Sequence, residues 1–455
     1  MAMTDLTADL ARFICAPPFS TVPIDAAAMI ESGFIDTTAT MIAGRSEPVV
    51  DIVREHLSDR IARRGESSVL FGVARASAAD AALINGTAGH ALDFDDVALG
   101  GHPSTVLVPA LLAEGEALSA SGAELLRAYL VGYEVWAELI SRDADPHHVK
   151  GWHPTAVFGT VAAAAAVAAL RRLPFEVARN AIALAGSMAG GLVANFGTMT
   201  KPFHAGRAAS SGIEAARLAM RGMTAAPDAM EHHAGFLKAL SPQGRVNLDR
   251  PADRLGHDLR IREAGLSIKQ YPICYATHRV IDGVIDAARR EDLSADQVAT
   301  VYAQIGKTQA SMLRNHAPQN GLEAKFSLEF AVASSLIARE VGLAQLTDAF
   351  VRRSDVQAAM KKVSTTTVDT SCPLEPIFAF ADRVQIELNN GRTIDTGEIR
   401  FARGNAKLPL TRDELKRKFM SCTGGAADVD AERIYRQLAS LDAVANVKEL
   451  TAAHR

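Results

Sequence analysis

The feature that most constrains the fold is a pair of neighbouring segments with almost no charge. Residues 154–171 and 175–192 are rich in alanine and other small or apolar residues, with helical periodicity. A helix without a polar face has to be enclosed by the rest of the protein. The first segment is too short and too weakly apolar to span a membrane, which takes about 20 apolar residues. We therefore expect a buried pair of helices inside a helical domain.

More helices are predicted around this pair. Alanine-rich segments with helical periodicity lie at 26–41, 48–64, 77–91, 122–142 and 206–221. Near the end of the chain, Thr411 and Glu414 have capping-box spacing and open a helix towards Met420, and 431–441 is a last helix. The fold class predicted is mainly α, with a large all-α domain formed by residues 1–267 and 403–455.

The intervening residues 268–402 have a different character. The segments 298–308 and 384–399 favour strands, and Asn390-Gly391 in the second is a hairpin signal. Residues 323–340, between them, are again helical. With 455 residues the chain exceeds what one core usually organises, so we expect a smaller α+β lid domain here.

Composition excludes several classes of function. A net charge of −4 with scattered Lys and Arg argues against nucleic acid as a partner. The four cysteines lie far apart without a C-x-x-C pair, which argues against a zinc site, a disulfide framework and an iron-sulfur cluster. No secretory signal and no membrane segment is evident, so a cytoplasmic location is expected.

The densest polar cluster lies in residues 89–105. If the helix from Ser77 continues, Asp93 and Asp96 share one face, and a Gly-rich loop brings His102 near the helix end. Aspartates exposed to solvent at the end of a helix would give the same sequence pattern. Magnesium-binding acids of prenyl-transferring helical enzymes are another interpretation, but they need a second acidic motif, and the later helices of this half have none of comparable density.

Two more clusters flank the uncharged helices. His153, in GWHPT, directly precedes the first of them and is either a capping residue or a rigidly held general base. Lys201, in GTMTKPFHAG, follows the second. Its flanking glycines suggest a tight turn that presents the ammonium inward, although loop lysines are usually solvated.

The last cluster, IKQYPICYATHR, lies where the two predicted domains meet in the sequence, and ligand clefts tend to form at domain junctions. Lys269 either binds a ligand or pairs with an acid. Cys274 is either a site residue or core, and His278 either a site residue or the start of a helix.

Taken together, HALDFDD, HPS, GWHPT, TKPFHAG, IKQYPICYATHR and AKFSLEFAVA occur in an order and spacing that resembles the MmgE/PrpD family over nearly the whole chain. That family includes 2-methylcitrate dehydratase, cis-aconitate decarboxylase and iminodisuccinate epimerase. The resemblance implies a helical domain, an α+β lid and a homodimer, with no metal or organic cofactor.

The family's motif positions carry over residue by residue. The residues of the expected type are Asp93, His102, His153, Lys201 and Lys269. Three positions depart from the pattern. Cys274 stands where the decarboxylases have histidine, Val97 where they have threonine, and Phe330 where tyrosine is frequent. These departures argue against decarboxylation of cis-aconitate and leave the shared proton chemistry in place.

The chemistry that the resemblance implies is removal of a proton beside a carboxylate. Such a proton is weakly acidic, so a base must lie against it and fixed positive charge must surround the developing anion. The resemblance assigns catalysis to His153 as base, or to Asp93 as base or orienting acid, together with Lys201. Lys201, Lys269, His102 and Cys274 would bind the substrate.

The function expected is a metal-independent lyase for a small di- or tricarboxylic acid, foremost a hydro-lyase similar to 2-methylcitrate dehydratase. An epimerase of an imino or amino dicarboxylate, similar to iminodisuccinate epimerase, is the alternative, beside a decarboxylase of cis-aconitate. From a different class, the chain is a non-catalytic binding protein that kept the fold. A binding protein needs the lysines but no base, so the retained polar positions favour an enzyme.

Overall fold

The computed structural model describes residues 5–451, and the chain forms two compact units. One comprises Met1–Ile268 and Thr411–Arg455, the other Lys269–Leu410. The return to the first unit comes eight residues later than the sequence suggested, because hydrogen bonds hold this stretch in the second unit. The backbone N–H of Arg403 donates to Asp282 at 2.7 Å, and the Asn405 amide contacts the Tyr275 hydroxyl at 2.8 Å.

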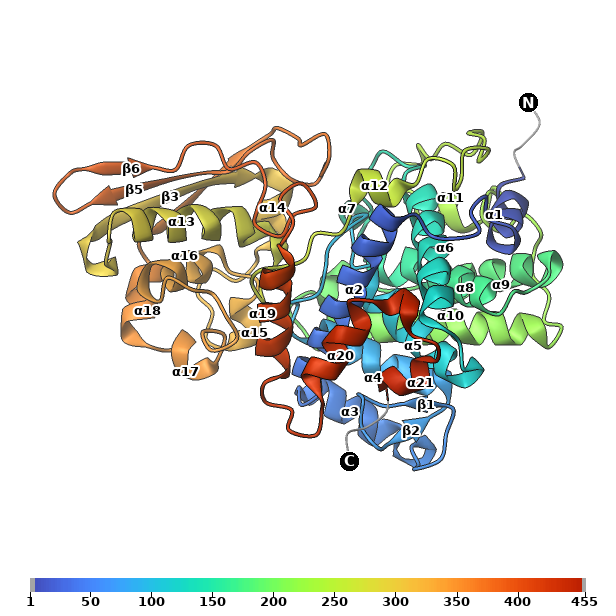
Figure 1. Ribbon diagram of the computed structural model, residues 1–455. Coiled ribbons are helices and arrows are strands. Elements are labelled where there is room, and N and C mark those ends of the chain that lie inside the picture. The colour runs from blue at the N-terminus through green and yellow to red at the C-terminus, as the bar shows by residue number, and fades with distance from the viewer. Residues whose placement is uncertain (1–4, 452–455) are drawn as a thin grey trace. The chain divides into compact units, whose positions relative to one another are not determined.

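The first unit is almost entirely helical (Figure 1). Its longer helices are α1 (Leu6–Cys15), α2 (Ile24–Gly44), α3 (Pro48–His56), α4 (Ala78–Ala91), α5 (Ser104–Leu118), α6 (Gly122–Ile140), α8 (Pro154–Leu170), α9 (Phe175–Met188), α10 (Thr200–Met220), α19 (Arg412–Thr423) and α20 (Ala431–Leu438). Shorter elements are α7 (His147–Lys150), α11 (Phe236–Leu240), α12 (Arg260–Ala264), α21 (Val447–Thr451) and the two-stranded pair β1 (Ser67–Ser68) and β2 (Arg75–Ala76).

The two helices predicted from segments with almost no charge, α8 and α9, differ in burial. Every residue of α8 is buried, as predicted, because α5, α6, α9 and α10 all pack against it. For α9 the prediction of complete enclosure is wrong. Only one face is buried, and Glu176, Arg179 and Asn180 lie on the partly exposed remainder. One charged or polar face is enough to keep an alanine-rich helix at the surface.

The crossing of α4 and α10 positions the chemistry described below. A Cβ atom added to Gly206 would lie 2.1 Å from the carbonyl oxygen of Leu83, and one added to Gly86 would lie 2.8 Å from the Cα of Gly206. No side chain fits at this crossing, so the two backbones touch. The C-terminus of α4 is thereby held beside the N-terminus of α10.

The second unit is built on a four-stranded mixed sheet with the order β4-β3-β5-β6. Its strands are β3 (Val298–Gly306), β4 (Val363–Val368), β5 (Arg383–Leu388) and β6 (Thr393–Asp395), and β3 pairs with β4 in parallel. Figure 1 shows α13 (His278–Arg290) along this sheet, and α16 (Leu328–Ile337) packs against α13. The alternation of buried Val384, Ile386 and Leu388 in β5 places one face on the core.

The remaining helices of this unit are short, namely α14 (Lys307–Met312), α15 (Gly321–Ala324), α17 (Asp348–Val351) and α18 (Ser354–Met360). The predicted hairpin is confirmed, with Gly391 at φ +84° between β5 and β6. The single helix predicted over 323–340 is wrong, because Ser327 caps a new helix by accepting from the N–H of Phe330. Within residues 5–451, none of the helices has both the length and the apolar character that crossing a membrane requires.

Candidate active site

The helix that was expected to carry two aspartates on one face ends before it reaches them. α4 stops at Ala91, and Asp93 adopts a left-handed backbone with φ +51°. The Asp93 carboxylate accepts from Lys201 Nζ at 2.7 Å, whereas Asp96 turns to Ser104 and accepts from its hydroxyl at 2.6 Å. The prediction that Asp93 and Asp96 share one helix face is therefore wrong. Their carboxylates bind different partners, whereas a magnesium motif would direct both to one ion.

Two histidines share the carboxylate between these aspartates. His90 Nδ1 lies 2.8 Å from one oxygen of Asp95, and His102 Nδ1 lies 3.1 Å from the other. The two imidazole rings are 4.4 Å apart. His102 thus lies near the end of α4, as the sequence predicted. Since all three side chains are buried, Asp95 fixes both rings without help from solvent.

The hydrogen bonds determine which ring nitrogens carry protons. His102 Nδ1 also contacts the backbone carbonyl of Asp96 at 2.8 Å, and a carbonyl only accepts, so this nitrogen donates. His90 Nδ1 likewise donates to the Asp95 carboxylate. In the neutral imidazoles both Nε2 atoms therefore carry a lone pair. His90 Nε2 is buried and has no hydrogen-bond partner among the described residues.

His153 directly precedes the buried helix α8 as its N-cap residue, as predicted, and its backbone N–H donates to the carbonyl of Gly191 at 3.0 Å. Its ring packs edge-on against Phe196, with centroids 4.8 Å apart. His153 Nδ1 lies 3.1 Å from His204 Nδ1, so one of these two nitrogens donates to the other. The ring centroids of His153 and His90 are 6.1 Å apart, which places His153 in the same cluster.

Lys201 lies in the first turn of α10 and not in the tight turn that its flanking glycines suggested. The helix starts at Thr200, six residues earlier than predicted. The ammonium is nevertheless directed inward: Lys201 is buried, pairs with Asp93, and lies 5.2 Å from the centre of the Phe196 ring. A buried cation is thus held at the edge of the histidine cluster.

Burial and this cation keep the imidazoles of His90, His153 and His204 neutral at physiological pH. The pKa of His90 falls to about 3, mainly through burial, with Lys201 adding to the effect. The pKa of His204 falls to about 4 through burial and the charge of Lys201. Burial, followed by the same ammonium, places the pKa of His153 well below its usual value. Neutral imidazoles can accept protons or bind metal ions.

Two predicted substrate ligands belong to the second unit. Lys269 is its first residue and is buried, and Cys274 is buried with its backbone N–H bonded to the carbonyl of Lys325. His278 is the first residue of α13, which matches the helix-start interpretation. Its Nε2 contacts the carbonyl of Ile273 at 3.2 Å.

The other two residues that depart from the family pattern are Phe330 and Val97. Phe330 is fully buried in the core of the second unit and packs edge-on against Phe350. A hydroxyl group at this place would need a buried partner. Val97 pairs with Ser267 through two backbone hydrogen bonds of 2.8 and 2.9 Å, so its backbone anchors the loop that carries the aspartates.

Sequence reasoning missed three residues of the cluster. His90 belongs to HALDFDD but was passed over in favour of the acids, and Asp95 was treated as one acid among three. His204 lies three residues after Lys201, a spacing that places both on one side of a helix. Had the helix been predicted to start at Thr200, this helical spacing would have placed His204 beside Lys201.

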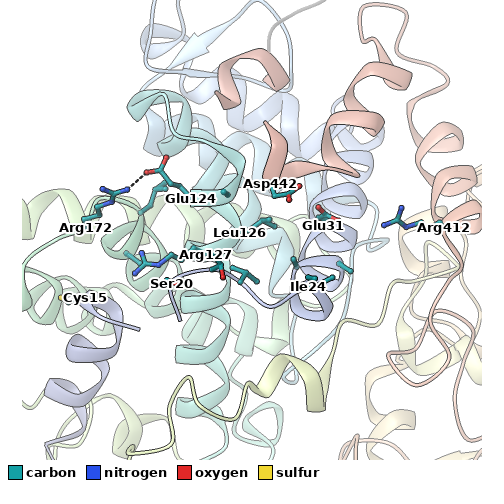
Figure 2. Close-up of a pocket in the computed structure, with 17 residues that line it drawn as sticks. Cys15, Ser20, Ile24, Glu31, Glu124, Leu126, Arg127, Arg172, Arg412 and Asp442 are labelled. Atoms are coloured by element: carbon teal, nitrogen blue, oxygen red, sulfur yellow. Dashed lines mark hydrogen bonds and ion pairs between the residues drawn. The ribbon is translucent and has the colours of Figure 1, made fainter. Parts of the chain in front are cut away.

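A separate cavity of about 830 Å³ in the first unit contains none of these residues. Figure 2 shows its mixed charge, with the Arg172–Glu124 pair at one side and Glu31 and Asp442 at another. Because it lacks a histidine and its acids and bases are spread over its wall, we locate the candidate site by side-chain chemistry and not by cavity size.

Neutral imidazoles around a buried ammonium, in a helical unit followed by an α+β unit, define a helical protein suited to proton transfer. The chain belongs to the MmgE/PrpD family, since residues 8–249 match the MmgE/PrpD N-terminal domain and residues 271–442 the C-terminal domain.

Its similar proteins include three with curated names. It is 30% identical to cis-aconitate decarboxylase of Mus musculus, over 74% of this chain and 70% of that protein. It is 28% identical to the Homo sapiens enzyme, over 85% and 81%. It is 26% identical to the cis-aconitate decarboxylase-like protein oryM of Aspergillus oryzae, over 98% and 97%.

Proposed function

We propose that this protein is a lyase that removes a proton next to a carboxylate of a small di- or tricarboxylic acid. The observation that carries the proposal is the group of imidazoles of His90, His102 and His153, of which burial keeps His90 and His153 neutral, beside the buried ammonium of Lys201. A substrate with several carboxylates supplies the anionic charge that such a site binds, and the imidazoles supply the base.

His153 is the base that we propose. Its position at the start of a fully buried helix fixes the ring, and its low pKa leaves a lone pair available at neutral pH. With His153 Nδ1–H donating to His204, the lone pair lies on Nε2, on the side away from His204. The alternative base, Asp93, already accepts from Lys201, so we assign it the role of holding that ammonium in place.

Lys201 is the proposed cation for a substrate carboxylate. It is anchored by Asp93 on one side and by Phe196 on another, which limits its motion before the substrate binds. For Lys269 and Cys274 the role of substrate ligands stays a prediction from the family resemblance, as does the homodimer.

Dehydration is the outcome that the site supports best. Loss of water from a hydroxylated acid begins with proton removal, for which neutral imidazoles are suited, and the proton that the base has taken up then leaves with the hydroxyl group as water. Decarboxylation of cis-aconitate needs a proton delivered to carbon after carbon dioxide leaves, and imidazoles with pKa values of about 3 and 4 hold few protons at pH 7. The curated names of the similar proteins favour decarboxylation, which we keep as the second candidate.

One experiment tests these candidates together. The purified protein is incubated in heavy water with citrate, 2-methylcitrate, cis-aconitate and an aspartate-like dicarboxylate, and the products are followed by NMR and mass spectrometry. We expect an unsaturated acid from a hydroxylated substrate, with deuterium in recovered substrate. Release of carbon dioxide from cis-aconitate would indicate a decarboxylase instead of a dehydratase. Deuterium in recovered substrate of inverted configuration would indicate an epimerase. A complete lack of exchange and turnover would favour a binding protein.

A further inference from the structure

Three imidazoles in the first unit bring one ring nitrogen each close together. His90, His102 and His153 come from the end of α4, the following loop and the start of α8, and one ring nitrogen of each lies within 4.8 Å of the others. Nitrogens bound to one tetrahedral zinc ion at about 2.0–2.1 Å are roughly 3.4 Å apart. The three nitrogens lie within 4.8 Å of one another, so each pair has to approach by no more than about 1.4 Å for one ion to contact all three. No local metal-binding motif marks the three histidines, because they are distant in the sequence.

The carboxylate of Asp95 prepares two of these rings for a metal ion. Histidine ligands usually donate the second ring N–H to a carboxylate, which fixes the tautomer and strengthens the donor nitrogen. His90 and His102 both contact Asp95 in this way through Nδ1. The buried Nε2 of His90 has no hydrogen-bond partner within residues 5–451, so a bound ion would satisfy an atom that nothing else satisfies.

The charges and the donor type define the class of ion. Asp93 and Asp95 contribute two negative charges near the ligand atoms, and Lys201 contributes one positive charge. A divalent ion therefore enters a site with a net negative charge. Imidazole donors suit zinc, cobalt, nickel and copper, whereas magnesium and calcium prefer oxygen ligands.

We propose that His90, His102 and His153 bind one divalent transition-metal ion, and that this ion inhibits the enzyme. The ion takes the lone pair of His153, which the proposed reaction needs as its base, so the metal-bound protein cannot remove a proton. The binding half of this inference stands on the geometry alone. The inhibition half rests on the proposed function, and the two are measured separately.

Binding is tested with cobalt as the probe. The metal-free, full-length protein is titrated with Co²⁺, and visible absorption reports tetrahedral or five-coordinate nitrogen ligation, after which Zn²⁺ displaces the cobalt. We expect one site per chain. His90→Asn should weaken binding at least 100-fold, and Asp95→Asn, which removes only the orienting carboxylate, by about 10–100-fold. The matched control is His233→Asn, because His232 and His233 form a neighbouring pair at the surface.

The outcomes of these measurements either support or refute the metal site. A cobalt spectrum that persists unchanged in His90→Asn but disappears in His233→Asn overturns the site in favour of the surface pair, and absence of stoichiometric binding to the unaltered protein overturns it outright. If His90→Asn does not fold, X-ray absorption of the zinc-loaded unaltered protein counts the imidazoles. Three support the site, whereas sulfur ligands or a single imidazole refute it.

Inhibition is then measured on any substrate that the heavy-water panel identifies. Chelator-treated protein should be active, and zinc should abolish proton exchange at the concentration that saturates the cobalt site. Zinc binding at the three histidines with exchange unaffected would retain the metal site and remove His153 from the role of base.

Discussion

Each of the two units has a buried carboxylate that contacts two side chains, an arginine and a glutamine in the second unit and two histidines in the first. In the second unit Arg279 contacts Glu375 at 3.0 Å and Asp382 at 3.7 Å, and Gln309 donates to Asp382 as well. In the first unit Asp95 lies between His90 and His102. Arginine never releases its proton under ordinary conditions, whereas imidazole does so readily. The arginine network can only hold structure, while the histidine cluster can also move protons.

The pKa values of the carboxylates show the same difference. Burial raises the pKa of Asp382 to about 7, against the opposing charge of Arg279. Burial also acts to raise the pKa of Asp95, but His90 and His102 outweigh it and hold that pKa well below its usual value. Asp95 therefore stays charged and keeps both rings oriented. Changes in the arginine network should alter stability alone, and changes in the histidine cluster should alter chemistry.

The largest effect is expected from Arg279→Met. This change leaves Glu375 and Asp382 buried without their cation and should lower the free energy of unfolding of the second unit by about 3–5 kcal/mol. Hydrogen exchange of β3 and β5 measures it directly. The control Arg383→Met removes an exposed pair with Asp395 and should cost no more than about 1 kcal/mol. Equal losses in the two variants would show that the buried network has no special role.

Lys201→Met should weaken substrate binding, and because it leaves Asp93 buried without its cation it should also lower the stability of the first unit. A substrate carboxylate left without its cation loses on the order of 2–5 kcal/mol of binding free energy. The apparent affinity for the polycarboxylate therefore falls by about 30-fold or more, as isothermal calorimetry would report. Lys238→Met, at an exposed lysine, serves as the control. Unchanged affinity in the Lys201 variant would remove this residue from the site.

The stability of the first unit should fall as the pH is lowered. His90 and His204 bind protons in the unfolded chain below their ordinary pKa of 6.5, but in the folded protein only near pH 3 and pH 4. Unfolding is thus favoured increasingly from pH 6.5 down to about pH 4, by on the order of 3 kcal/mol for each histidine.

Tryptophan fluorescence isolates this unit, because both tryptophans of the chain, Trp136 and Trp152, belong to it. Urea unfolding at pH 7 and pH 4.5 should differ strongly in the unaltered protein and less in His90→Asn. A stability that does not change over this range would contradict the burial of neutral histidines.

The smallest of these effects in free energy is the loss of the base. His153→Ala should slow deuterium exchange into the substrate by about 10²-fold, which corresponds to roughly 2.7 kcal/mol in the barrier. His278→Ala, in the second unit, is the comparison, since that ring contacts the carbonyl of Ile273 and has no proposed chemical role. If both variants slow exchange equally, the distinction between a catalytic and a structural histidine disappears.

Local signals in the sequence were sufficient for much of the secondary structure. The uncharged composition of 154–171 predicted a fully buried helix, the capping box at Thr411 predicted α19, and Asn390-Gly391 predicted the hairpin. Strand β4 was missed because its threonine-rich residues are mostly exposed and show no alternation of burial. The break at Ser327 was missed because a single serine cap looks like an ordinary helix residue.

For the candidate site, the sequence by itself determined the family and four polar residues, because the motifs that carry them are short and local. The fold brings these residues together in the first unit: Asp93, His102, His153 and Lys201. Only the tertiary structure decided their partners. The direction of Asp93 depends on a left-handed turn after α4, and its meeting with Lys201 depends on two glycines at the crossing of α4 and α10. The pairing of His90 with Asp95 depends on the loop after α4, which brings Asp95 back to the end of that helix. Such contacts join residues far apart in the chain, and their geometry depends on packing that no local pattern encodes.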